Sequence, residues 1–360
     1  MRIVFLTDAL TSGGLETHLQ TFINELIKRG HQVLVHSYFT NPVFFQGIRD
    51  PHGLFHHMIG TDDALTDIAS FAPEVVHSHP FYAIIRGSQI AEALHKPFFI
   101  TIHGLYNSGL DNSESGVRVC EKASSVIAVD DGVAALLARS IPTPEKLVVI
   151  PNGIDLQTFS PLAPSRNRLK APGFNPDCFT ITFLTRFQDG KETPVFQLLE
   201  HAPLIAKRLG GLNLILVGFG SFYDRIQELS NIACQKSKFL HVFLTGPQLE
   251  VRPYLAMADL VLGCGRSALE AMACQRPVFA AYQTGFAGLI DKNSFDELIF
   301  SLKGYWNPLP EEAFIEYLIK LGRSEIRLRR SAEQGLEIIK SRFNIIDAVT
   351  QLENMYQQHL

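Results

Sequence analysis

Arg186 and Lys191 stand five positions apart, directly after the β-branched and aromatic run 180–185. Such a run is typical of a buried parallel strand, and open α/β sheets bind ligands beyond the carboxyl ends of their strands. A guanidinium fork and an ammonium point charge on one loop can straddle a diphosphate. The alternative is a solvated loop in which Asp189 and Glu192 neutralise both cations.

Two glycine-containing turns each connect an expected strand to an expected helix. One contains Gly13 and Gly14, and the other spans 263–267. Glycines let backbone approach a ligand closely, and the N–H groups at a helix start attract an anion. Glu270 falls in the first turn of the second helix, where the dipole favours a carboxylate that could also accept hydroxyl hydrogen bonds. A purely structural turn is the alternative at both places.

Three histidines, His77, His79 and His103, lie at the carboxyl ends of expected parallel strands. A single histidine in such a place is usually a core residue, but three at one sheet edge favour a polar wall. Zinc is the alternative, and neither an H-E-x-x-H motif nor a cysteine partner supports it.

The sequence lacks the motifs of several common binding and catalytic sites. The chain has no G-x-G-x-x-G, no Walker loop, no G-x-S-x-G elbow and no D-x-D. A diphosphate would therefore be held by cations and helix N-termini, and we expect neither a metal nor another cofactor.

Short β-branched or aromatic runs alternate with helical stretches along the chain, which predicts parallel sheets covered by helices on both faces. The alternation is interrupted by a proline-rich stretch, 151–177. We therefore expect a domain at 1–160, a linker at 161–177 and a second domain at 178–342. The apolar spacing in 345–358 predicts a last helix that returns to the first domain, which residues 343–360 complete. The expected strands are 3–7, 32–39, 74–79, 98–103, 125–129, 146–150, 180–185, 212–217, 242–245, 260–263 and 277–282.

Composition agrees with two globular domains. The chain has 360 residues, 46% hydrophobic and 19% charged, and a single core stops growing at roughly 250–300 residues. A net charge of −4 argues against a nucleic-acid partner. Residues 1–160 carry 10 Lys and Arg against 16 Asp and Glu, which leaves 22 against 20 for the rest. The cationic binding is therefore expected in the second half.

The compartment is expected to be the cytoplasm. Mean hydropathy is +0.10, but charged residues interrupt every apolar stretch before the ~18 residues that a spanning helix needs. Asp8 comes too early for a signal peptide. The 5 cysteines contain no C-x-x-C pair, so we expect reduced thiols.

Short blocks of residues follow one another along the chain in an order typical of one enzyme family. They are Gly13-Gly14 with Glu16 and His18, Arg29-Gly30-His31, Glu74 to His79, Thr101 to Gly104, Val149 to Asp155, Arg186 with Lys191, Gly218 with Gly220, Thr245-Gly246, Ala258-Asp259 and Leu269 to Ala273. Over nearly the whole chain this order resembles the retaining glycosyltransferases of the GT-B fold, specifically glycosyltransferase family 4 (group 1).

The resemblance implies two Rossmann-like, doubly wound domains facing a central cleft, with a nucleotide-diphosphate sugar held mainly by the second. Arg186 and Lys191 would hold the diphosphate, and Glu270 would bind the ribose. The loop 245–249 would lie beside the base. His103 would lie by the transferred sugar, with His103, Arg186 and Lys191 as catalytic residues. The implied donor-binding set is Gly13, Gly14, Arg186, Lys191, Gly218, Gly246, Gln248, Gly265, Arg266, Ser267 and Glu270, and the acceptor side has Glu16, His18 and His79.

One departure concerns the family's two glutamates separated by seven residues. Glu270 matches the second, but Leu262 occupies the place of the first. Backbone N–H groups of 263–267, or Arg266, are the candidates to replace it.

The favoured function is a metal-independent, retaining hexosyltransferase that uses a UDP-sugar. Its acceptor would be a sugar or a lipid-linked glycan in polysaccharide or glycoconjugate biosynthesis. Two alternatives remain, a GT-B nucleotide-sugar epimerase and a non-catalytic nucleotide-sugar-binding partner of another transferase. Peripheral association with the inner membrane face is left open, although the acidic first domain gives it little support.

Overall fold

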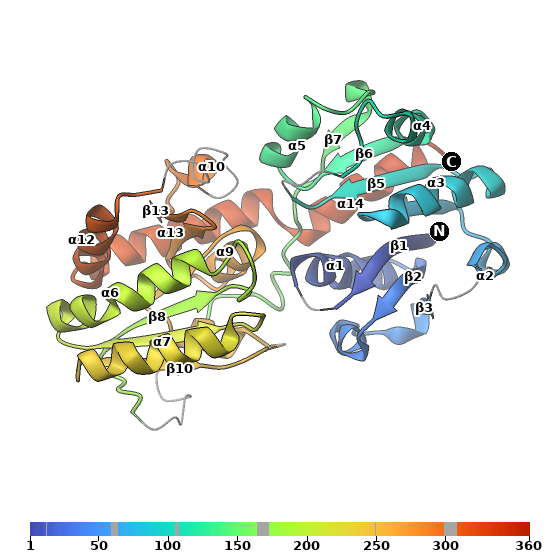
Figure 1. Cartoon of the computed structure of the whole chain (residues 1–360). Coiled ribbons are helices and arrows are strands. Elements are labelled where there is room, and N and C mark those ends of the chain that lie inside the picture. The colour runs from blue at the N-terminus through green and yellow to red at the C-terminus, as the bar shows by residue number, and fades with distance from the viewer. Residues whose placement is uncertain (12, 59–63, 105–107, 164–172, 249, 299–307) are drawn as a thin grey trace. The chain divides into compact units, whose positions relative to one another are not determined.

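The structure is a computed structural model, and it describes residues 1–11, 13–58, 64–104, 108–163, 173–248, 250–298 and 308–360. The chain folds into two compact units. The first comprises Met1–Asp155 together with Phe343–Leu360, and the second comprises Leu156–Arg342. Figure 1 traces both units.

The first unit is built on a 7-stranded sheet in the order β3-β2-β1-β4-β5-β6-β7. All its strand pairs are parallel. The strands are β1 (Arg2–Leu10), β2 (Gln32–Thr40), β3 (Leu54–Met58), β4 (Val75–Ser78), β5 (Phe98–Ile102), β6 (Ser125–Ala128) and β7 (Leu147–Val149).

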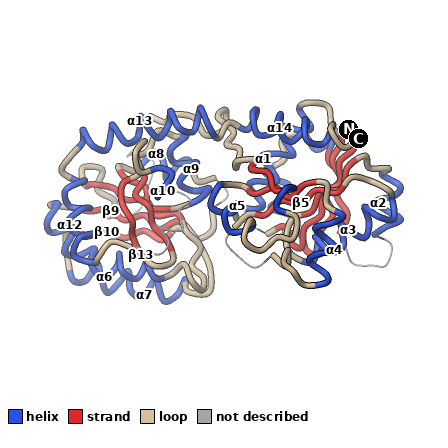
Figure 2. Tube along the Cα trace, turned by 90° about the horizontal axis from the view of Figure 1, so that it is seen from above, coloured by secondary structure: helices blue, strands red, loops and turns tan. Residues whose placement is uncertain are grey.

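Helices cover both faces of this sheet (Figure 2). Alternate residues of β1 point to opposite sides: Ile3 and Phe5 belong to one core, whereas Val4 and Leu6 belong to another. The first core is closed by α1 (Gly14–Lys28), α14 (Ile345–Gln357) and the 3₁₀ turn η1 (Pro42–Gly47), and the second by α2 (Ala64–Phe71), α3 (Tyr82–Leu94), α4 (Glu114–Lys122) and α5 (Asp131–Leu137). Short 3₁₀ turns also occur at η2 (Pro51–Gly53) and η3 (Pro144–Lys146).

The second unit has a 6-stranded sheet in the order β10-β9-β8-β11-β12-β13. Every pair is parallel except β12 with β13, which is antiparallel. The strands are β8 (Phe179–Leu184), β9 (Leu212–Val217), β10 (Leu240–Leu244), β11 (Leu260–Gly263), β12 (Val278–Tyr282) and β13 (Gly285–Leu289).

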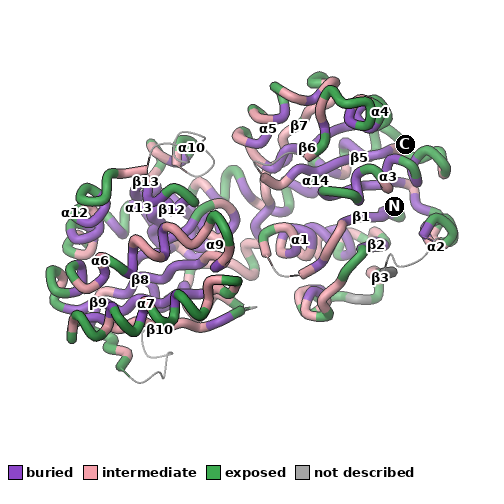
Figure 3. The backbone as a smooth tube through the Cα atoms, in the orientation of Figure 1, coloured by how far each residue is buried: buried purple, intermediate pink, exposed green. Residues whose placement is uncertain are grey.

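The helices of the second unit lie on both faces of its sheet. One face packs on α6 (Thr193–Leu209), α7 (Tyr223–Lys236) and α12 (Glu311–Gly322). The remaining helices are α8 (Arg252–Met257), α9 (Gly265–Ala273), α10 (Phe295–Leu298) and α13 (Glu325–Arg342). In Figure 3 the strands of each unit are mostly buried, whereas the outward sides of the helices are exposed. The alternation read from the sequence is thus confirmed as two doubly wound α/β folds.

The last helix, α14, packs on the first unit. Its apolar stripe, which includes Val349 and Leu352, lies in the same core as Ile3 and Phe5. The chain arrives there through paired backbone hydrogen bonds, in which Ile154 N–H donates to Phe343 O and Ile345 N–H donates to Ile154 O. A polar clasp adds to this contact, because Arg29 and His31 both bind the carboxylate of Glu353.

The expected linker at 161–177 differs from the structure at its described ends. Leu162 O accepts a hydrogen bond from Arg276, and Asn175 O accepts one from the side chain of Asn213. These ends therefore belong to the second unit, and residues 164–172 of that expectation lie outside the described residues.

Two strands were missing from the sequence expectation. β3 contains no β-branched residue, and β13 contains two glycines, Gly285 and Gly288. Both are edge strands, where pairing with one neighbour demands less of the side chains.

Candidate functional site

Each sheet has one place where the strand order reverses. In the first unit β1 lies between β2 and β4, and in the second β8 lies between β9 and β11. The connections leaving such a pair run to opposite faces, so a crevice opens at the carboxyl ends of the strands. The segments named from the sequence lie at these ends: 13–14 and 79–80 in the first unit, and 185–191 and 264–267 in the second.

The loop after β8 carries Arg186 and Lys191, both half-buried. Burial, together with the neighbouring Arg186 guanidinium, lowers the pKa of Lys191, and Cys264 acts in the opposite direction. In the part of the chain that the structure describes, Lys191 forms no salt bridge. Glu192 instead accepts the backbone N–H of Lys191, and Asp189 is exposed. The two cations thus lie close enough to repel each other, and a bound anion would relieve that repulsion.

Close packing between two loops explains why glycine occupies positions 218 and 220. The loops after β8 and β9 are joined by a hydrogen bond from Phe187 N–H to Phe219 O. A Cβ on Gly218 would lie 1.9 Å from Thr185 O, and one on Gly220 would lie 2.2 Å from Phe187 O. Only glycine permits this approach, so these residues shape the loop that carries Arg186.

The turn after β11 opens helix α9. Cys264 occupies the N-cap position without a side-chain cap, and Gly265 has a φ of 55°. Ser267 donates its hydroxyl proton to Cys264 O. The first N–H groups of this nine-residue helix are therefore not capped by Cys264, which suits a bound anion.

Arg266 and Glu270 form a buried ion pair on α9. The Arg266 Nε atom lies 2.9 Å from Glu270 Oε1, and the two residues are only 9% and 7% exposed. Burial raises the pKa of Glu270, and the Arg266 guanidinium opposes that rise. The carboxylate is held in one orientation, with its second oxygen left for another donor.

The loop after β10 contains Gly246 and Gln248. Gly246 has a φ of 69° and open space around its Cβ position. Gln248 is exposed, and its side-chain amide donates to Thr245 O at 2.8 Å. Leu249, the last residue expected in this loop, lies outside the described residues.

In the first unit, the turn after β1 is organised by Glu16. Its Oε1 accepts hydrogen bonds from the N–H and the hydroxyl of Thr11, at 2.9 and 2.7 Å. Gly13 has a φ of 157°, and nothing lies within 4 Å of the Cβ position of Gly14. Glu16 is buried, so it holds the turn while the glycines keep its backbone accessible.

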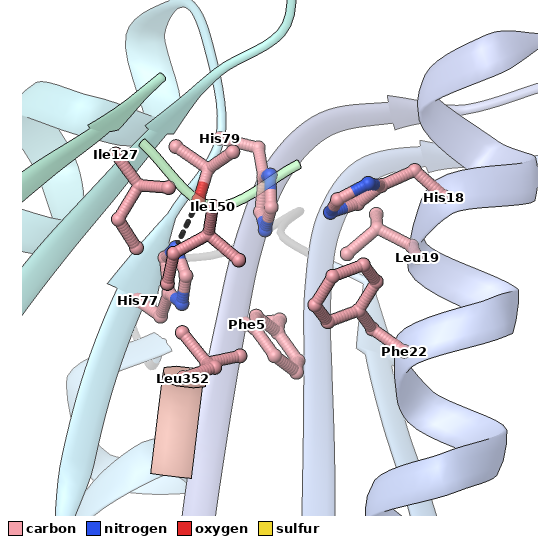
Figure 4. A pocket seen from close by; sticks show the side chains of 10 residues that line it. Phe5, His18, Leu19, Phe22, His77, His79, Ile127, Ile150 and Leu352 are labelled. Atoms are coloured by element: carbon pink, nitrogen blue, oxygen red, sulfur yellow. Dashed lines mark hydrogen bonds between the residues drawn. The ribbon is translucent and has the colours of Figure 1, made fainter. Parts of the chain in front are cut away.

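Four histidine rings gather beside this turn. His79 follows β4, His103 follows β5 and His18 lies on α1, while His77 belongs to β4 itself. His79 Nδ1 lies 2.6 Å from His103 Nε2, and His18 Nδ1 lies 3.0 Å from the Asn152 side-chain oxygen. His18, His77 and His79 border a small cavity (Figure 4). The expected polar wall is therefore a packed column of rings.

Each half of the chain matches the model of a known protein family. Residues 12–158 match the model "Glycosyltransferase Family 4", and residues 178–321 match "Glycosyl transferases group 1".

The chain is a glycosyltransferase of this family 4 and group 1 type.

Curated relatives of the glycosyltransferase carry related names. It is 25% identical over 323 residues to the D-inositol 3-phosphate glycosyltransferase of Pseudarthrobacter chlorophenolicus, covering 79% of this chain and 74% of the relative. It is 30% identical over 252 residues to the enzyme of that name from Xylanimonas cellulosilytica, covering 60% and 57%.

Solved structures share the fold of the glycosyltransferase. The Anabaena protein Alr3699/HepE in complex with UDP-glucose superposes with a TM-score of 0.77 at 18% identity, covering 99% of this chain and 100% of that one. Because the identity is so low, this likeness establishes the GT-B fold alone.

Sequence reasoning about the glycosyltransferase missed two relationships. The i,i+4 spacing of Arg266 and Glu270 is a signal for their ion pair. No local signal links His18 to Asn152, which is 134 positions away.

Two kinds of feature are absent from the described residues. They contain no group of three or more His, Cys, Asp or Glu side chains placed to hold a metal ion. Across the same ranges, no helix has both the length and the apolar character to cross a membrane.

Proposed function

We propose that the second unit binds the diphosphate of a nucleotide-sugar donor through Arg186 and Lys191. The observation that carries this proposal is the position of these two residues on the loop after β8, where the strand order reverses. The neighbouring strand, β11, leads directly into the start of α9. Charge-assisted hydrogen bonds from a guanidinium and an ammonium suit a diphosphate, and the ammonium is partly desolvated, because burial together with the nearby Arg186 guanidinium lowers the pKa of Lys191.

We propose uridine as the base and a hexose as the sugar. The family resemblance favours UDP, and the UDP-glucose complex of the Anabaena protein supports the same donor. In this proposal Glu270 accepts hydrogen bonds from the ribose hydroxyls, while Arg266 keeps its carboxylate ionised and oriented.

The proposed reaction retains the anomeric configuration. The bond between the sugar C1 and the β-phosphate oxygen breaks, and an acceptor hydroxyl oxygen bonds to C1 from the same side. The acceptor proton passes to the departing phosphate oxygen. Negative charge grows on the diphosphate as this happens, so Arg186, Lys191 and the α9 N–H groups stabilise the transition state more than the ground state. No metal is required in this scheme.

The first unit would supply the remaining groups. We propose that Gly13 and Gly14 approach the phosphate and that His103 acts on the transferred sugar. Glu16, His18 and His79 would form the wall behind the acceptor, since all three are buried. The acceptor would be a sugar or a lipid-linked glycan used for polysaccharide or glycoconjugate synthesis.

Incubation of the protein with a panel of nucleotide sugars tests the proposal. Slow release of free sugar and nucleotide diphosphate, accelerated by a glycan acceptor, is the expected result. A new nucleotide sugar would instead indicate an epimerase. Tight donor binding without turnover would indicate a non-catalytic partner, a reading that Leu262 favours because it replaces an acid of the family.

A further inference from the structure

The four rings of the histidine column, His18, His77, His79 and His103, contact one another in a defined arrangement. The rings of His77 and His79 stack at 4.9 Å between centroids. The ring of His103 is nearly parallel to that of His79, with an interplanar angle of 26° and centroids 4.9 Å apart. His18 meets His103 edge-on at 4.6 Å. These ring contacts fix the orientation of His103 through its neighbours.

The far end of the column is anchored by hydrogen bonds. His77 Nδ1 pairs with the hydroxyl of Tyr356 on α14, and His77 Nε2 lies 2.7 Å from the hydroxyl of Thr101. Tyr356 is fully buried. The column therefore runs from the last helix of the first unit to His103, and both nitrogens of His77 are used.

His79 is neutral in this position. It is 1% exposed, and burial together with the neighbouring rings of His103, His77 and His18 lowers its pKa well below the ordinary range. A neutral imidazole has one donor nitrogen and one acceptor nitrogen. The short contact between His79 Nδ1 and His103 Nε2 must therefore join one donor to one acceptor.

The surroundings of His79 Nε2 decide which atom donates. Among the described residues this buried nitrogen has no hydrogen-bond partner. The ring borders a cavity of about 10 Å³ with mainly apolar walls such as Phe5, Ile127 and Leu352 (Figure 4). Buried N–H groups without a partner are very rare, and unfilled acceptor sites are less so. The proton of His79 accordingly belongs on Nδ1.

We infer that His79 is a positioning residue that donates from Nδ1 to His103 Nε2 and so holds the proton of His103 on Nδ1. His103 is thereby fixed both in orientation and in tautomer. The consequence for catalysis rests on the proposed role of His103 at the transferred sugar, where an Nδ1 donor recognises a sugar oxygen.

Two substitutions of His79 separate positioning from packing. His79→Asn keeps an N–H donor near the position of Nδ1, whereas His79→Phe keeps the ring and removes the donor. With the full-length protein and UDP-glucose as probe, we expect His79→Phe to lower kcat by on the order of tenfold or more with a smaller change in KM. We expect His79→Asn to recover most of the activity. Equal activity of His79→Phe and wild type, or failure of His79→Asn to recover any, would overturn the inference.

The ¹⁵N spectrum of labelled histidines gives a readout that does not depend on turnover. At neutral pH we expect His103 to show a protonated Nδ1 and an unprotonated Nε2, and His79→Phe to lose this preference. A proton on Nε2 of His103 in the wild type would overturn the inference. His103→Ala tests the proposed function separately: full turnover in that variant would refute the role of His103, whereas the spectrum alone decides the tautomer.

Discussion

Arg266 and Glu270 neutralise each other inside the second unit, one helical turn apart on α9, with 2.9 Å between Nε and Oε1. Taking two charges out of water is costly, and a buried pair is retained only when its geometry is good. Arg266 lies in the first turn of α9, and Glu270 lies one turn later. The ion pair therefore connects the stability of the second unit to the proposed binding of the nucleotide.

Arg266→Met should therefore make nucleotide binding depend on pH. Without the guanidinium the pKa of Glu270, already raised by burial, rises further, so the carboxyl is increasingly protonated near neutrality. We expect UDP affinity of the variant to increase from pH 6 to pH 8 more steeply than that of wild type, because the second ionisation of the terminal phosphate, with a pKa of about 6, contributes equally to both. Loss of one buried partner also costs about 3–5 kcal/mol of stability. Calorimetric titration across this range measures the effect, and equal slopes for Arg266→Met and wild type would contradict it.

Arg186→Ala and Lys191→Ala should each weaken donor binding and turnover. A charge-assisted hydrogen bond contributes about 1.5–3 kcal/mol, and the loss should be larger in kcat/KM than in affinity, because charge grows on the leaving diphosphate. Arg225→Ala is the matched control, since Arg225 is exposed on α7 and pairs with Glu228. If the two loop variants behave like that control, the diphosphate site has been assigned to the wrong loop.

Chelation should leave the activity intact. In the proposed donor site the cations and the α9 N–H groups would provide the positive charge for the diphosphate, and the chain has no D-x-D motif. Turnover after dialysis against EDTA should equal turnover before it. Activity that disappears with EDTA and returns with Mg²⁺ or Mn²⁺ would disprove metal independence.

The first unit should lose stability as the pH falls below about 6.5, the ordinary pKa of histidine. Burial lowers the pKa of His77 to about 3, and it lowers that of His79 as well. Between these values the unfolded chain binds protons that the folded unit does not, so stability decreases with decreasing pH by about 1 kcal/mol per pH unit for each ring.

Urea unfolding at pH 7.5, 6.5 and 5.5 measures this slope. His77→Leu should be less stable than wild type at every pH, but its stability should vary less over this range. His52→Asn, at an exposed position of the same unit, should keep the wild-type slope. Identical slopes for His77→Leu and wild type would mean that the column is not the source of acid sensitivity.

The sequence predicted the parts of this structure that depend on local patterns. The runs 212–217 and 260–263 match β9 and β11 in full, because buried parallel strands are continuously apolar. The carboxyl ends of the expected strands at β8 and β11 then located the segments that carry Arg186 and Glu270. The column of His18, His77, His79 and His103 depends on ring orientations, which no spacing encodes, and its anchor Tyr356 lies 279 positions from His77.

The two-part composition of the first unit has a consequence for synthesis on the ribosome. Domains tend to fold as they emerge, starting from the N-terminus, but one face of the β1–β7 sheet is covered by residues 345–356, which are translated only after the whole second unit. The later unit can therefore finish folding first. Until α14 arrives, α1 and η1 alone cover that face, so the apolar surface that α14 buries stays exposed and the nascent first half is a natural client for chaperones.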